Sequence, residues 1–176
     1  MKANRMRWNA LALTCLVTIG TCMAAQSPDT RAARRFVQRF YDWYSPRAMS
    51  AKAGPAWNLA LKAKTASFSP ALRRALRADV NAQAKSTGEI VGLDFDPFLN
   101  SQDPELRYVA GTPVASRGSY LVGVHGASAT KPAVFAKVES RHGAWRFTNF
   151  IYSSGDNLLE VLERLKKLRE SGSSHP

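Results

Sequence analysis

The sequence has little cysteine, few acidic residues and no long apolar run. Its two cysteines, Cys15 and Cys22, both lie near the start of the 176-residue chain, which excludes a disulfide, a thiolate metal site and a thiol nucleophile after residue 24. A multi-pass membrane protein is excluded because its spans need about 20 apolar residues each. Since 45% of the residues are hydrophobic and 22% are charged, the composition predicts one globular domain.

Common enzyme motifs are also missing. The chain has no Gly-x-Ser-x-Gly, no phosphate-binding loop and no His-Glu-x-x-His. Of the three histidines, we expect His142 in a hairpin turn and His175 in the tail, which leaves His125 as a candidate base. These absences favour a non-catalytic protein that needs no cofactor and no metal.

The first 24 residues predict an export signal. Lys2, Arg5 and Arg7 precede an apolar segment at residues 10–21, and a small-x-small cleavage site follows at residues 22–24. We expect cleavage after Ala24 and a periplasmic or secreted protein. The alternative is a lipoprotein anchored through Cys22.

Helical signals dominate the first half of the remaining chain. Ser27-Pro28 and Ser69-Pro70 each place a capping residue before a proline at the first helical position. We predict helices at residues 28–45, 57–67 and 70–88, the first ending because the residue before Pro46 avoids the helical region.

The second half predicts strands and one more helix. After an ordered loop at residues 89–105, we expect strands at residues 106–114, 119–124, 133–139 and 144–152, the last two joined by a hairpin turn at residues 140–143. Alternation places Trp145, Phe147, Asn149 and Ile151 on one face. Asp156 is expected to cap a leucine-striped helix. The order predicts a single α+β domain at residues 25–170 and a flexible tail at residues 171–176.

Several segments resemble a family of small exported bacterial proteins of unknown function with a nuclear-transport-factor-2-like, or cystatin-like, fold. The resemblance covers residues 32–165 and is most specific in the Leu-Asp-Phe-Asp-Pro-Phe run at residues 93–98, supported by the aromatic residues 36–44 and 145–152. It implies a cone in which N-terminal helices pack on a curved antiparallel sheet around a cavity, with an extra C-terminal helix in this chain. It also implies a possible homodimer formed through the sheet, and it carries over no catalytic residue.

An oxygen-rich loop holds the densest cluster of candidate polar residues: Asp94, Asp96, Asn100 and Asp103. Such groups suit Ca²⁺, although the spacing is not that of an EF-hand. Asp94 and Asp96 alternate and could also act as an acid/base pair. The alternative is structural, with these side chains capping turns and pairing with arginines.

Other candidates could line a cavity or a binding surface. They are Trp43, Tyr44, Trp57, His125, Asn149 and Tyr152. Apolar pockets with a few polar groups are typical of ligand sites, but an aromatic stripe at helical spacing is equally typical of a core.

Positive charge is in excess, with 25 Lys and Arg against 13 Asp and Glu, for a formal net charge of +12. Two clusters form a candidate basic surface: Arg31, Arg34, Arg35 and Arg39 on the first helix, and Arg73, Arg74 and Arg77 on the third. Because export argues against nucleic acid, we expect anionic lipid, lipopolysaccharide or an acidic protein as partner. The alternative is a solvated face.

The sequence therefore favours an exported, non-catalytic binding module of the bacterial cell envelope that acts through protein–protein contact. One alternative is an immunity protein that neutralises a secreted toxin. Another is a small-ligand binder or enzyme that uses the cone cavity, with Asp94, Asp96 and His125 as its polar groups.

Overall fold

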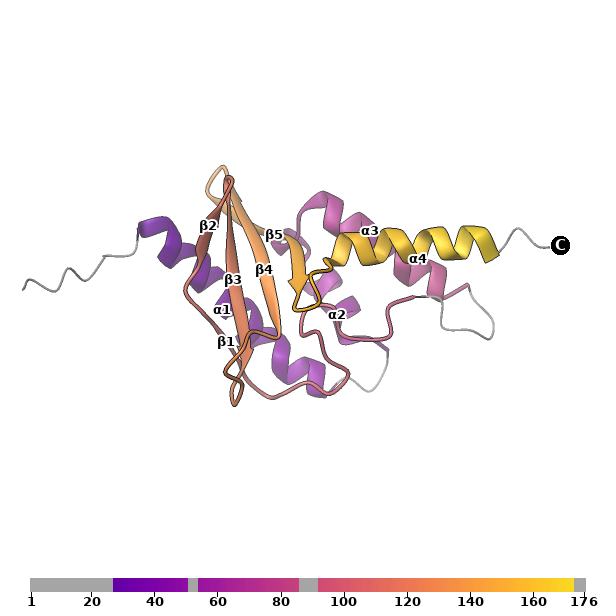
Figure 1. The fold of residues 1–176 in the computed structure, drawn as a ribbon, viewed down its shortest axis with the longest axis horizontal. Coiled ribbons are helices and arrows are strands. Elements are labelled where there is room, and N and C mark those ends of the chain that lie inside the picture. The colour runs from indigo at the N-terminus through magenta and orange to yellow at the C-terminus, as the bar shows by residue number, and fades with distance from the viewer. Residues whose placement is uncertain (1–26, 51–53, 86–91, 173–176) are drawn as a thin grey trace, which may run out of the picture.

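The computed structural model describes residues 27–50, 54–85 and 92–172, which form an α+β fold (Figure 1). The predicted class is confirmed. In chain order the elements are α1 (Pro28–Met49), α2 (Ala56–Ala63), the 3-10 helix η1 (Thr65–Ser67), α3 (Pro70–Gln83), β1 (Tyr108–Ala110), β2 (Val114–Ser116), β3 (Ser119–Gly126), β4 (Val134–Arg141), β5 (Ala144–Tyr152) and α4 (Leu158–Gly172). The predicted export signal lies outside the described residues.

Helix α1 begins as predicted but ends later. The Ser27 hydroxyl accepts a hydrogen bond from the Thr30 amide at 3.2 Å. The helix then continues through Pro46 to Met49, so the predicted end at residue 45 is wrong. The Ser45 hydroxyl and the Arg47 guanidinium donate to the carbonyls of Tyr41 and Trp43, and these side-chain bonds support the turn in which proline supplies no amide donor.

The other N-terminal helices are shorter than predicted. The segment predicted as one helix at residues 57–67 divides into α2 and η1. Helix α3 starts at the Ser69 cap, whose hydroxyl accepts from the Leu72 amide at 3.2 Å. It ends at Gln83, and the Leu93 amide donates to the carboxylate of Asp79. The predicted end at residues 87 and 88 lies outside the described residues.

The sheet is antiparallel, with the order β1-β3-β4-β5, and β2 pairs with β3 beside β1. The single strand predicted at residues 106–114 is therefore wrong: it forms β1 and the start of β2. The Gly111 amide still donates to the carbonyl of Gly123 on β3, and the ladder is interrupted after it, where Pro113 has no amide donor. The other predicted strands are confirmed, and β3 and β4 extend by two residues beyond their predicted ends.

The β4–β5 hairpin is confirmed, and its turn places His142 and Gly143 at positive φ angles of 51° and 76°, as a two-residue type I′ turn requires. A register shift between Lys137 and Val138 leaves Thr148 unpaired. This bulge puts Phe147 on the same buried face as Phe150 and Tyr152. The predicted uninterrupted alternation of residues 145, 147, 149 and 151 is wrong for this reason.

Helix α4 is capped by Asn157 instead of Asp156. The Asn157 side-chain oxygen accepts from the Glu160 amide at 3.2 Å, and the helix continues to Gly172 and so includes the first two residues of the expected tail. Leu158 and Leu162 are buried, whereas Leu168 is 61% exposed. Helices α3 and α4 extend side by side away from the sheet (Figure 1). No helix among the described residues has the length and apolar character needed to cross a membrane.

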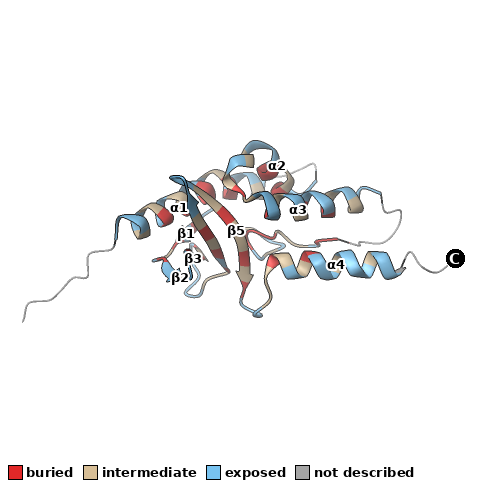
Figure 2. Cartoon of the chain, turned by 90° about the horizontal axis from the view of Figure 1, so that it is seen from above, coloured by how far each residue is buried: buried red, intermediate tan, exposed pale blue. Residues whose placement is uncertain are grey.

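The core lies between α1 and one face of the sheet. Helix α1 covers this face, α3 and η1 contact β5, and α2 packs on the helices. The red buried positions of β5 belong to this face (Figure 2). Five phenylalanines fill the centre: Phe40, Phe68, Phe98, Phe147 and Phe150. Each ring has a neighbouring ring in this set with centroids 5.2 Å apart or closer. The space where the resemblance implies a cavity is occupied here by packed side chains.

Candidate functional site

The structure brings three of the predicted site residues to one loop. Asp96 accepts a short hydrogen bond from the Tyr44 hydroxyl and further bonds from the amides of Phe98 and Leu99, at 2.9 and 3.2 Å. The Tyr152 hydroxyl donates to the carbonyl of Pro97 at 3.1 Å. These contacts attach residues 96–99 to α1 and β5.

Burial controls the ionisation of this group. It raises the pKa of Asp96 from 3.8 to about 6, against the hydrogen bonds from Tyr44, Phe98 and Leu99, which lower it. Burial also raises the pKa of Tyr44 well above its ordinary value, and the nearby Asp96 charge adds to this. A fully bonded carboxylate of this kind serves to fix the loop.

The other polar residues of the loop point to structural roles. Asp94, Asn100 and Asp103 are exposed. Asn100 donates to the carbonyl of Ala133 at 3.1 Å, and the backbone of Asp103 bonds in both directions with the Ser101 hydroxyl. In the part of the chain that the structure describes, no three His, Asp or Glu side chains gather as a metal site would require.

His125 is separated from Asp96 by the sheet. It alternates with the buried Val124 and pairs with Val109, which is 40% exposed, so its side chain lies on the outer face. Asp96 bonds to α1 on the inner face. The structure therefore does not bring His125 together with Asp96, although both were expected among the polar groups of a cavity site.

The remaining predicted cavity residues have structural contacts. Trp57 is buried in the core. Trp43 contacts two cations, with Arg47 at 4.7 Å and Lys64 at 5.0 Å from the centre of its ring. Asn149 accepts from the Leu159 amide and donates to Asn157, so it holds the start of α4 against β5.

Six of the seven residues of the predicted basic surface are exposed. Arg31, Arg34, Arg35 and Arg39 are exposed on α1, and Arg34 also donates to the carbonyl of Ala110 at 2.9 Å. On α3, Arg77 is exposed and Arg73 is half-buried. Arg74 alone among the seven lines the pocket described below.

A buried ion pair was missed by the sequence analysis. Asp79 is 1% exposed and its carboxylate lies 2.8 Å from the guanidinium of Arg169, which is 16% exposed. The same carboxylate accepts from the Gln83 side chain and the Leu93 amide, which links α3, α4 and the loop. The helical spacing of these residues could have indicated the pair. Asp79 lies one turn after Leu76 on the apolar face of α3, and Arg169 lies one turn after Leu165 on the apolar face of α4.

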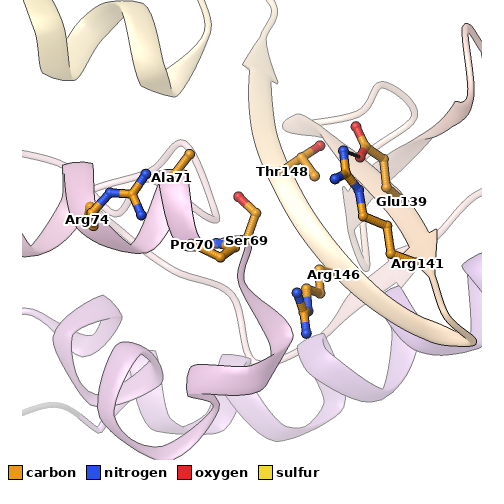
Figure 3. Close-up of a pocket in the computed structure, with 8 residues that line it drawn as sticks. All are labelled: Ser69, Pro70, Ala71, Arg74, Glu139, Arg141, Arg146 and Thr148. Atoms are coloured by element: carbon orange, nitrogen blue, oxygen red, sulfur yellow. Dashed lines mark hydrogen bonds and ion pairs between the residues drawn. The ribbon is translucent and has the colours of Figure 1, made fainter.

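A second missed feature is a surface pocket of about 420 Å³ between the start of α3 and the β4–β5 hairpin (Figure 3). Its polar and charged lining residues are Ser69, Arg74, Glu139, Arg141, Arg146 and Thr148. We call it the arginine pocket. Figure 3 shows Ser69 and Arg74 on the α3 side and the other four on the strands.

The outer face of the sheet exposes apolar side chains. Val109, Val114 and Phe135 are 40%, 64% and 37% exposed, and their cross-strand partners include Leu121, which faces Val114, and Ile151, which faces Phe135. The Phe135 ring covers Gly123, where an added Cβ would lie 3.4 Å from it. We call these five apolar residues, 109, 114, 121, 135 and 151, the outer-face patch.

A comparison of the chain with protein-family models, curated proteins and solved structures finds no match.

Proposed function

We propose that this protein is an exported, non-catalytic binding module of the bacterial cell envelope that contacts another protein through the outer-face patch. The observation that carries the proposal is the exposure of Val109, Val114 and Phe135 on a continuous sheet face. Large apolar side chains exposed together on one sheet face favour an interaction site.

The charge around the patch defines the partner. Lys137 lies within the face, opposite Leu121, and the exposed Arg107, Arg117 and Lys131 lie in the segments that flank its strands. With a net charge of +12 for the whole chain, a second copy would bring like charges together. We therefore expect a different protein whose binding surface has an apolar centre and an acidic rim.

The inner face supports the same conclusion. The aromatic core fills the space between α1 and the sheet, and Asp96 and His125 lie on opposite faces. We propose that the domain is of the nuclear-transport-factor-2-like type, with the packed core in place of the ligand cavity and with its function moved to the outside of the sheet. Export rests on the signal at residues 1–24.

Crosslinked capture from the native envelope tests the proposal when it uses matched variants. Phe135→Asp and the control Leu59→Asp each replace a partly exposed apolar side chain, 37% and 45% exposed, with an acid. We expect a stoichiometric partner with wild type and L59D that is lost with F135D. Val114→Asp repeats the test at a side chain that is 64% exposed. This substitution should disturb folding least, because little of the Val114 side chain is buried.

Three outcomes would contradict the proposal. Recovery of the same partner with F135D and V114D would place the contact elsewhere. Absence of any partner would direct attention to small ligands. A wild-type homodimer that F135D dissociates would assign the patch to self-association, which sedimentation of the purified protein would detect.

A further inference from the structure

The arginine pocket holds more positive charge than its surroundings balance. Three arginines and one glutamate line it, which leaves a formal charge of +2. Glu139 is engaged by Arg141, with the two charged groups 3.4 Å apart. No ion-pair partner for Arg74 or Arg146 is found among the described residues.

The fold assembles these charges from distant parts of the chain. Arg74 comes from α3, and Arg146 comes from β5, where it faces Glu139 across the strand pair. Like charges brought to one concave site repel one another, and the low-dielectric walls of a pocket strengthen their field. An anion in the pocket would relieve this repulsion.

We propose that the arginine pocket binds the phosphoryl group of a small organic ligand. A phosphate monoester carries a charge close to −2 at neutral pH, which matches the pocket. The forked guanidinium groups suit its oxygens because they donate paired hydrogen bonds.

The neighbouring hydroxyl fits the same ligand. Ser69 uses its oxygen to accept from the Leu72 amide, so its hydroxyl proton remains to be donated to a phosphoryl oxygen. The volume of about 420 Å³ falls within the range of roughly 300–1,000 Å³ typical of small-molecule sites. Phosphate alone would leave much of it empty, which is why we expect an organic body attached to the phosphoryl group.

Calorimetric titration of the full-length protein with glycerol 3-phosphate, at about 0.15 M salt, tests the proposal. The informative variant is Arg74→Ala with Arg146→Ala. Its matched control is Arg35→Ala with Arg39→Ala, which removes the same charge from the exposed face of α1. We expect saturable binding that weakens at least about tenfold in R74A/R146A and is unchanged in R35A/R39A.

Glu139→Gln provides a gain-of-binding test. Because it releases Arg141 from its ion pair and removes the negative charge in the pocket, we expect tighter binding of glycerol 3-phosphate. Thermal unfolding of each variant verifies that the fold is kept.

A second experiment with vesicles that contain phosphatidic acid, whose headgroup is also a phosphate monoester, distinguishes the source of the phosphoryl group. Binding of glycerol 3-phosphate identifies a soluble ligand. Attachment to vesicles that R74A/R146A loses and R35A/R39A keeps, without binding of the soluble compound, identifies a lipid headgroup. The proposal is overturned when both double variants lose binding equally, which indicates general charge attraction, or when neither probe binds the wild-type protein.

Discussion

Removal of the Asp79 carboxylate should destabilise the domain more than any surface substitution. Asp79→Ala takes away a partner that is 1% exposed and that accepts from Arg169, Gln83 and Leu93. Breaking a buried ion pair by deleting one member costs about 3–5 kcal/mol. For a domain of this size we expect a fall in Tm of about 10–20 °C.

Urea unfolding followed by circular dichroism measures this free energy. The control is Asp156→Ala, which removes the ion pair to Arg164, also in α4 but with side chains 42% and 58% exposed. We expect a loss below about 1 kcal/mol for the control. Equal losses for the two variants would refute the reasoning, because the Asp79 carboxylate differs from that of Asp156 in its burial and in the hydrogen bonds that it accepts from Gln83 and Leu93.

Three further predictions concern stability. Because the folded pKa of Asp96, about 6, lies above its unfolded value of 3.8, the folded state binds more protons between these values, and its free energy of unfolding should fall by up to about 3 kcal/mol as pH rises from about 4 to 6. Urea unfolding at pH 4 and 7 should show a smaller fall in the free energy of unfolding for Asp96→Asn than for wild type. The same pH dependence in both proteins would contradict the assignment of this effect to Asp96. Phe98→Ala, which removes a 0% exposed ring stacked on Phe68, should cost about 3–5 kcal/mol in the same assay, and a loss under about 1 kcal/mol would show that the core is not packed as described. Ser69→Ala should cost about 1 kcal/mol through loss of the α3 cap, and an unchanged urea midpoint would argue against that cap.

Local signals predicted the element starts well. The Ser-Pro pairs at residues 27–28 and 69–70 begin α1 and α3 because capping and the fixed φ of proline depend only on neighbouring residues. The hairpin turn was equally predictable, since Gly143 tolerates the positive φ that it requires.

Other features depend on contacts that a one-dimensional pattern does not contain. Helix α1 continues through Pro46 with support from the side chains of Ser45 and Arg47. The bulge at Thr148 changes which face Phe147 occupies. In the first case proline does not end the helix, and in the second the strand does not alternate strictly, although both rules hold for most sequences.

The candidate sites show the same limit. Sequence grouped Asp96 with Asp94 and His125 by residue type, whereas the sheet separates Asp96 from His125 and leaves Asp94 exposed. The arginine pocket joins Arg74 to residues about seventy positions later in the chain, and nothing in the local sequence indicates that they meet. Tertiary topology decides both cases.

The measurement that tests the central claim most directly is the affinity of the purified protein for its captured partner, in wild type and Val114→Asp, at low and at moderate salt. We predict at least about a tenfold loss of affinity for V114D, because residue 114 is 64% exposed at the outer-face patch. We also predict weaker wild-type binding at higher salt, because the partner's rim is acidic. Equal affinities for wild type and V114D, independent of salt, would contradict a contact through the outer face of the sheet.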